Sequence, residues 1–335
     1  MDLEQIINSF NKLHQQLNQY TVMELESVAR QAEQQNPWFT ENNFLSAYKG
    51  ILSLISEEAL KLYTDKYGAL DLQSKNIGLI TAGNIPGVGF HDILICLLSG
   101  ASVEVKLSSE DRVMIPFLMK ELKTSNEELA ARCTFIEKLN LNEVDGVIAT
   151  GSNNTSRYFE QYFSKKPNVI RKSRTSLAIL TGEESDSELD ALVDDIVSYF
   201  GLGCRNVSKL LLKQNTDLIP LLQRLEKRTD LNGFSKYDNN YLYYKSIYLV
   251  NREEFLDTET ILIKETKELN APISVLYYQR FDTDEEINQY LQSIEDQVQC
   301  VVGKSDDLIN FGEAQSPTIL EYADGVDVRE FIDGL

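Results

Sequence analysis

Histidine and cysteine are scarce in this chain of 335 residues, which contains only two histidines and four cysteines. The cysteines lie at positions 96, 133, 204 and 300, and their spacing forms no CxxC pair or other metal-ligand pattern. Two histidines, His14 and His91, are too few for a histidine-rich metal site. We therefore expect no bound metal, four separate thiols in a reducing compartment, and chemistry that rests on Cys, Asn, Lys or carboxylate side chains.

Basic residues are also few, because 32 Lys and Arg face 52 Asp and Glu and leave a net charge of −20. This charge repels a phosphate backbone and excludes broad nucleic-acid binding, whereas a small anionic ligand needs only a pocket. The longest apolar runs, such as Ile93–Leu98, are too short to span a bilayer. The acidic start, Met1–Gln5, is unlike a secretory signal, so we expect a cytoplasmic protein without a membrane span.

The apolar pattern changes along the chain. Residues 1–70 carry apolar side chains at helical spacings of three and four, whereas short β-rich runs alternate with helical stretches after residue 76. This alternation predicts a parallel sheet with helices on its faces. A second α/β unit follows Cys204. The predicted strands are 77–81, 103–106, 146–149, 176–180, 207–212, 241–250 and 273–278, with helices in the second unit near 216–228 and 283–295.

Two loops between these elements have ligand-binding character. Residues Thr81–Gly89 leave a predicted strand and enter the apolar helix 90–98, which is where open α/β sheets bind ligands. The glycines at 83, 87 and 89 do not form GxGxxG, and the alternative is a plain turn. Residues Ala149–Thr155 precede the helical stretch 156–163, where backbone N–H groups with the Ser152 and Thr155 hydroxyls would bind a phosphate. The alternative there is an ordinary N-cap cluster.

A third loop, Tyr199–Asn206, contains a cysteine in an unusual setting. Cys204 follows two glycines, lies outside an apolar run and precedes Arg205. A neighbouring cation favours the thiolate, which is the nucleophilic form of cysteine. The other three cysteines are interpreted as small buried apolar residues.

These three loops, in this order, resemble the acyl-CoA reductase branch of the aldehyde dehydrogenase superfamily, the branch of the fatty-acyl reductase of bacterial luminescence. The resemblance runs from about residue 76 to the end, and its strings are 83–86, 105–109, 150–152, 203–204, 268–273, 281–286, 312–317 and 322–327. It implies an α/β, aldehyde-dehydrogenase-like fold. The expected parts are a helical N-terminal segment (1–70), a parallel-sheet NAD(P)-binding domain (71–175), a second α/β catalytic domain with the nucleophilic cysteine (176–300) and a C-terminal return segment (301–335).

The resemblance also implies roles for single residues. Cys204 would attack a thioester carbonyl to form an acyl-enzyme, and the Asn84 side chain with the Cys204 backbone N–H would stabilise the oxyanion. The implied cofactor contacts are Lys106 and Ser108 at the adenosine ribose, Gly151, Ser152 and Thr155 at the pyrophosphate, and Glu268 at the nicotinamide ribose.

Two departures from the superfamily refine the expected activity. Residues 169–174 contain no carboxylate, although oxidising dehydrogenases have a water-activating glutamate in this segment. This favours reduction of a thioester over hydrolysis of the acyl-enzyme. Ser109 lies where NAD-preferring relatives often have a glutamate that would repel a 2′-phosphate, so it leaves room for NADPH.

We therefore expect NADPH-dependent reduction of a fatty acyl thioester, such as an acyl-CoA, to the aldehyde through an acyl-cysteine. The alternatives are an aldehyde or semialdehyde dehydrogenase of the same superfamily and a non-catalytic binding subunit. The expected partners are a second copy of the chain or an enzyme that supplies acyl groups. The charge of −20 disfavours an acidic carrier protein as donor and so favours CoA.

Three further groups of residues have a structural and a functional interpretation. His91 and Asp92 are expected to line a helix start rather than form an acid–base pair. Four basic residues are interpreted as solvated surface, and the alternative is that they contact CoA phosphates. Five tyrosines are interpreted as packing residues of a strand, and the alternative is that they form a wall along the acyl chain. These residues are Arg171, Lys172, Arg174 and Arg205, and Tyr237, Tyr241, Tyr243, Tyr244 and Tyr248.

Overall fold

The computed structural model describes residues 1–68 and 70–335. The chain forms two compact units, of which the first combines Met1–Ser173 with Pro317–Leu335 and the second comprises Arg174–Ser316. The four-part division expected from the sequence stays a prediction. Among the described residues, no helix has both the length and the apolar character needed to cross a membrane.

The first unit begins with four helices, as expected from the spacing of apolar residues. They are α1 (Leu3–Leu17), α2 (Val22–Gln35), α3 (Glu41–Leu54) and α4 (Glu57–Tyr67). Capping boxes at Asp2 and Thr21 satisfy the first N–H groups of α1 and α2. Ile6, Phe10 and Leu13 of α1 are fully buried, which confirms the helical face read from the sequence.

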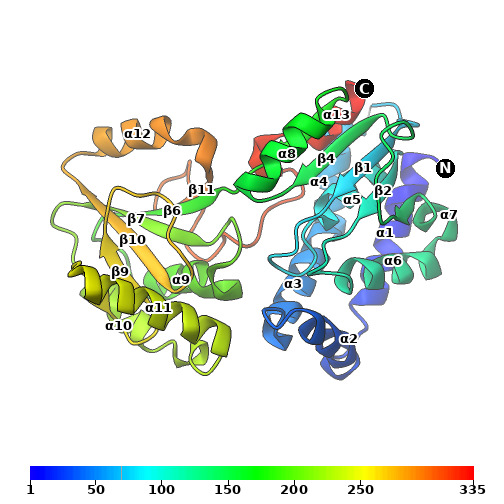
Figure 1. Ribbon diagram of the computed structural model, residues 1–335. Coiled ribbons are helices and arrows are strands. Elements are labelled where there is room, and N and C mark those ends of the chain that lie inside the picture. The colour runs from blue at the N-terminus through cyan, green and yellow to red at the C-terminus, as the bar shows by residue number, and fades with distance from the viewer. Residues whose placement is uncertain (69) are drawn as a thin grey trace. The chain divides into compact units, whose positions relative to one another are not determined.

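A five-stranded parallel sheet forms the centre of this unit (Figure 1). Its strands are β1 (Asn76–Ile80), β2 (Ser102–Lys106), β3 (Cys133–Phe135), β4 (Gly146–Thr150) and β5 (Asn168–Arg171), in the order β3-β2-β1-β4-β5. The intervening helices are α5 (Phe90–Leu98), α6 (Met114–Ser125), α7 (Glu127–Ala130) and α8 (Asn153–Phe163). Phe159 and Phe163 of α8 pack on the face of the sheet that carries Val147 and Ala149.

The C-terminal segment returns to the first unit. It contains η4 (Ala323–Gly325) and α13 (Val328–Asp333), and α13 packs against α5. Val328, Ile332 and Arg329 are fully buried. The Arg329 guanidinium donates through Nη2 to the carbonyl of Asp71 at 2.6 Å and through Nε to the carboxylate of Asp333 at 3.0 Å. These contacts make the return segment part of the core of the first unit.

The second unit contains a six-stranded sheet in the order β11-β6-β7-β10-β9-β8, in which only the β8–β9 pair is antiparallel. In Figure 1, α12 lies on one side of this sheet and α10 and α11 lie on the other. The strands are β6 (Thr175–Leu180), β7 (Val207–Lys213), β8 (Leu256–Asp257), β9 (Leu262–Glu265), β10 (Val275–Phe281) and β11 (Val298–Val302). The helices are α9 (Asp186–Val197), η1 (Ser198–Gly201), α10 (Ile219–Glu226), η2 (Thr229–Leu231), α11 (Ser235–Asn251), α12 (Asp284–Ser293) and η3 (Glu295–Gln297).

One predicted strand, 241–250, is wrong, because these residues belong to helix α11. The tyrosines at 237, 241, 244 and 248 follow one another at intervals of four, three and four, which is a helical spacing. Tyr241, Tyr244 and Tyr248 pack with Leu262 and Val275 of the sheet. These tyrosines therefore lie on the packed face of a helix rather than in a strand, whereas Tyr243 is exposed.

Candidate functional site

The carboxyl ends of β1, β2 and β4 meet at one edge of the first sheet. Ile80 pairs with Lys106 on one side and with Ala149 on the other. The strand order changes direction at β1 and β4, and the loops leaving such a switch point diverge to form a crevice for ligands. The loops that begin at Thr81, Lys106 and Thr150 therefore leave the sheet at the same edge.

The loop after β1, residues 81–89, is fixed by contacts with the loop after β2. The N–H of Ser108 donates to Oγ1 of Thr81 at 3.1 Å. A Cβ atom at Gly83 would lie 2.5 Å from Oγ of Ser108, so only glycine allows the two loops to approach this closely. Asn84 follows in the same loop and is exposed, as are Lys106 and Ser109.

Asp111 anchors the other end of this loop. Its carboxylate accepts hydrogen bonds from the N–H of Gly87 at 2.7 Å and from the N–H groups of Val113 and Met114 at 3.3 Å each. Asp111 is buried, and burial raises the pKa of its carboxyl group. Sequence reasoning missed this residue because its partners are main-chain groups.

The loop after β4 leads directly into helix α8. Ser152 is the N-cap, since its Oγ accepts from the N–H of Thr155 at 3.3 Å, and the two hydroxyl oxygens lie 3.0 Å apart. A Cβ at Gly151 would lie 3.0 Å from Cβ of Thr155, so the backbone is tightly packed here. The N-cap interpretation is confirmed, while a phosphate at this helix start stays a prediction.

A buried ion pair occupies the interior of the first unit beside these loops. Nη1 of Arg171, the last residue of β5, lies 2.5 Å from Oδ2 of Asp92 in the first turn of α5. Arg171 is 5 % exposed and Asp92 is 2 % exposed. The interpretation of Arg171 as solvated surface is wrong, and its burial also excludes the alternative contact with CoA phosphates.

The histidine beside Asp92 and the other three basic residues named from the sequence each have a partner within the protein. His91 lies in the first turn of α5, as expected, with Nε2 2.8 Å from the carbonyl oxygen of Ile319, and burial lowers the pKa of its imidazole. Lys172 forms an exposed pair with Glu160 at 2.7 Å. Arg174 donates to the carbonyl of Val298 at 3.0 Å, and Arg205 donates to that of Ala314.

In the second unit, Cys204 lies in a turn that follows a strained segment. Tyr199, Phe200 and Gly201 have φ values of 51°, 57° and 75°, so three successive residues adopt the left-handed conformation. Such strain in non-glycine residues costs of order 1–3 kcal/mol each and concentrates at functional sites. Of the four cysteines, Cys204 alone is exposed, which agrees with its selection from the sequence.

Hydrogen bonds from two buried polar residues hold the main chain around Cys204. Oγ of Ser176 donates to the carbonyl of Cys204 at 2.9 Å. Oδ1 of Asn206 accepts from the N–H of Gly203 at 2.8 Å, and its Nδ2 donates to the carbonyl of Ser198 at 2.8 Å. The main chain is therefore held by hydrogen bonds on both sides of the cysteine, and the Cys204 side chain itself is exposed.

Asp195 braces the neighbouring segment, residues 312–314. Its carboxylate accepts from the N–H of Gly312 at 2.6 Å and from the N–H of Ala314 at 3.0 Å. Burial raises the pKa of Asp195 to about 6. The carbonyl of Ala314 accepts from Arg205, so Asp195 and the loop of Cys204 both bind the main chain of the segment 312–314.

Glu268 lies in the connection between β9 and β10, where its side chain is exposed. The hydroxyl of Tyr277 donates to Oε2 of Glu268 at 3.3 Å. The main-chain carbonyl of Glu268 accepts from Nζ of Lys209 at 2.9 Å. Lys209 is fully buried and was missed from the sequence, although a lone lysine inside the apolar strand 207–212 was the available signal.

The candidate residues are divided between the units. The structure brings those of the first unit to one sheet edge, and it holds Cys204 and Glu268 on two loops of the second unit. The residues of the first unit are Asn84, Lys106, Ser108, Ser109, Gly151, Ser152 and Thr155. Their contacts with a ligand stay predictions.

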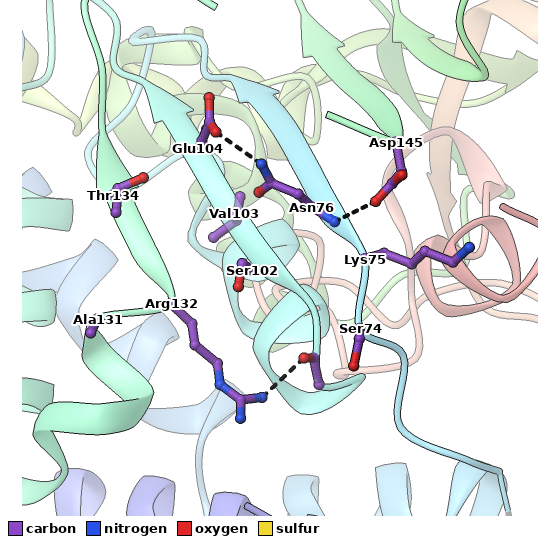
Figure 2. Close-up of a pocket in the computed structure, with 11 residues that line it drawn as sticks. Ser74, Lys75, Asn76, Ser102, Val103, Glu104, Ala131, Arg132, Thr134 and Asp145 are labelled. Atoms are coloured by element: carbon purple, nitrogen blue, oxygen red, sulfur yellow. Dashed lines mark hydrogen bonds between the residues drawn. The ribbon is translucent and has the colours of Figure 1, made fainter. Parts of the chain in front are cut away.

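A separate polar cavity of about 570 Å³ lies at the amino ends of β1 and β2 (Figure 2). Asn76 at its centre donates through Nδ2 to Oε1 of Glu104 and through its N–H to Oδ2 of Asp145, each at 2.8 Å. Arg132 at its rim donates to the carbonyl of Gly100 at 3.0 Å. These polar groups bind one another, and the cavity is at the opposite end of the strands from the candidate residues.

A comparison with protein families finds a match to one part of the chain. Residues 64–224 match the family model for acyl-CoA reductase (LuxC). The family whose model matches this part of the chain is the one that the sequence resembles. The expected enzyme class, an acyl-CoA reductase and thus an oxidoreductase, is confirmed. The matched span includes Asn84, Lys106, Ser152 and Cys204 but not Glu268. No curated protein sequence matches the chain.

Solved structures confirm the expected aldehyde-dehydrogenase-like fold. The NAD⁺ complex of aldehyde dehydrogenase from Bacillus cereus has a TM-score of 0.67 at 13% identity, covering 92% of this chain and 72% of that one. An aldehyde dehydrogenase structure from Burkholderia cenocepacia gives 0.66 at 13% identity, with 92% and 75% covered. Betaine aldehyde dehydrogenase from Staphylococcus aureus gives 0.67 at 13% identity, with 94% and 73% covered. At such identities the likeness establishes the fold.

Proposed function

We propose that the protein reduces a fatty acyl-CoA to the aldehyde with NADPH through an acyl-cysteine at Cys204. The observation that carries the proposal is an exposed cysteine in a braced turn within the matched span of an acyl-CoA reductase family. In this reaction the sulfur of Cys204 bonds to the thioester carbonyl carbon, the bond from that carbon to the CoA sulfur breaks, and the CoA thiolate takes up a proton.

Two N–H groups would stabilise the negative charge that develops on the carbonyl oxygen. One is the backbone N–H of Cys204, and the other is the side-chain amide of Asn84. The peptide group that carries this N–H is held through its carbonyl, because the N–H of Asn206 donates to the carbonyl of Gly203 at 3.1 Å. One oxyanion donor of this kind contributes about 3–4 kcal/mol to the transition state, so Asn84→Ala should lower kcat about 100- to 1,000-fold.

The residues at the edge of the first sheet fit a dinucleotide. Lys106 supplies an exposed ammonium at the end of β2, and the missing side chains of Gly83 and Gly151 allow close loop packing. Lys106 and Ser108 would hold the adenosine ribose, Ser152 and Thr155 the pyrophosphate, and Glu268 the nicotinamide ribose. When bound, NADPH supplies the hydride that releases the acyl group as an aldehyde.

The segment from 169 to 174 supports reduction over hydrolysis. It contains no carboxylate to activate water, and its buried arginine, Arg171, is paired with Asp92. A cation held in this way takes no proton from water. This disfavours the alternative of an acid-forming dehydrogenase.

The test is the intact mass of the protein after incubation with a long-chain acyl-CoA, first without and then with NADPH. We expect one acyl adduct that maps to Cys204, is absent from Cys204→Ser and disappears when NADPH is added. Cys300→Ser is the matched control, because Cys300 is the other thiol in the second unit and is half-buried. An adduct retained in Cys204→Ser refutes the assignment. Turnover of short but not long acyl-CoAs would favour a semialdehyde dehydrogenase.

A further inference from the structure

Lys209 is a fully buried lysine in the middle of β7, five residues after Cys204. Its Nζ lies 2.9 Å from the carbonyl oxygen of Glu268, 2.9 Å from Oε1 of Gln279 and 3.0 Å from the hydroxyl of Tyr290. An ammonium group has three hydrogens to donate, and these three acceptors come from three different segments. The arrangement is therefore matched to the protonated side chain.

A charged lysine at this position is costly for the fold. In the described part of the chain, none of the hydrogen-bond partners found for Nζ is a carboxylate. Its neighbours along the strand, Leu210 and Leu211, are fully buried. Apolar residues of similar volume often replace buried charges without loss of stability. The ammonium is therefore better explained by the groups that it holds in place than by the stability of the strand.

We propose that Lys209 is a positioning residue that holds the main chain of Glu268 and so fixes the carboxylate of Glu268 for the cofactor. This inference rests on the proposed function, in which Glu268 contacts the nicotinamide ribose. Tyr277, the register partner of Lys209 on β10, donates to the carboxylate of Glu268 at 3.3 Å. Paired positions on two strands thus hold the main chain and the side chain of the same residue.

The groups around Lys209 make its hold on the main chain of Glu268 depend on pH. The titratable groups that face Lys209 are Glu268, Tyr290 of α12 and Tyr277 of β10, and its register partner on β6 is the apolar Leu177. Burial raises the pKa of both tyrosines, so they stay neutral as Lys209 titrates. Burial lowers the pKa of Lys209 to about 8. A neutral amine donates more weakly to the carbonyl of Glu268, because the bond is no longer charge-assisted, so cofactor binding should weaken as the pH rises through about 8.

The experiment measures NADPH affinity by fluorescence titration and Cys204 acylation by intact mass, each with the full-length protein. We expect Lys209→Met to raise the Kd for NADPH about tenfold, which corresponds to about 1.4 kcal/mol. Cys204 acylation without cofactor should stay within about twofold of wild type. Lys213→Met is the control, because Lys213 lies on the same strand but pairs with Asp284 at the surface. This control should leave the Kd unchanged.

A double-variant cycle separates positioning from general damage. If Lys209 acts through the Glu268 carboxylate, Lys209→Met should add no loss of affinity in a Glu268→Ala background. Additive losses, or a Kd for Lys209→Met equal to that of Lys213→Met, would overturn the inference. If Lys209→Met does not fold, two other measurements decide, namely the Kd of Tyr290→Phe for NADPH and the pH dependence of the wild-type Kd. A Tyr290→Phe Kd equal to that of wild type, together with a wild-type Kd that is constant between pH 7 and about 9, overturns the inference. A wild-type protein that neither binds NADPH nor forms the adduct refutes the proposed function instead.

Discussion

The buried pair between Asp92 and Arg171 gives the sharpest test of how the first unit is stabilised. Asp92→Asn keeps the size and shape of the side chain but removes the charge that lies 2.5 Å from the guanidinium. Because Arg171 is 5 % exposed, its charge would stay buried without its bonded carboxylate, and Asp324 would be the remaining acid that acts on it. Breaking a buried pair in this way costs about 3–5 kcal/mol.

Thermal unfolding followed by circular dichroism provides the assay. For a unit of 150–250 residues, about 3–5 kcal/mol corresponds to a fall in Tm of about 6–20 °C. Glu160→Gln is the control in the same unit, because Glu160 pairs with Lys172 at 2.7 Å but both side chains are about half exposed. Exposed pairs contribute about 0–1 kcal/mol, so the control should shift Tm by no more than about 4 °C.

The double variant Asp92→Asn with Arg171→Met removes both charges. It should recover most of the stability lost in the single variant, because the penalty comes from leaving one charge uncompensated. The reasoning is refuted if Asp92→Asn behaves like Glu160→Gln, or if the double variant loses the sum of the two single losses.

Two further predictions concern Asp195 and Ser109. Because burial raises the folded pKa of Asp195 to about 6, from 3.8, its protonated form is the one the fold favours. Its contribution is full below about pH 4 and is lost as the pH rises through about 6, so the stability difference between wild type and Asp195→Asn should change by about 3 kcal/mol over this range. Denaturant unfolding at pH 4 and 6.5 measures this, and a constant difference contradicts it. Ser109→Glu should raise the KM for NADPH at least about tenfold and leave that for NADH nearly unchanged, because a carboxylate repels the 2′-phosphate. Steady-state kinetics with both cofactors checks this, and equal changes in the two KM values would argue against it.

Most of the fold could be predicted because its strands are short, apolar and separated by helical stretches. The predicted strands 77–81, 103–106 and 207–212 overlap β1, β2 and β7 closely. The error at 241–250 arose where tyrosines and β-branched residues, which are common in strands, form a helix. Packing against the sheet decided the outcome, since the buried tyrosines recur at helical intervals.

The candidate site could be predicted only in part. Glycines identified the turn around Cys204, because a chain that must turn tightly leaves a local signal. Asp195 and Asp111 left no such signal, because they bind main-chain N–H groups of other segments. The lone lysine in an apolar strand was a signal for Lys209, but its three partners become visible only in the fold. A buried polar residue reveals its role only when the fold shows which N–H or carbonyl it satisfies.

The first unit is built from two separate parts of the chain, and this affects the order in which the units can fold on the ribosome. Residues 174–316 are continuous, so the second unit can fold as soon as they have emerged. The first unit must wait for residues 317–335, which bring Val328, Ile332 and Arg329 into its core. Until then the apolar surface beside α5 stays uncovered and open to aggregation or chaperones. A premature stop codon near residue 317 would therefore damage the part of the protein that was translated first.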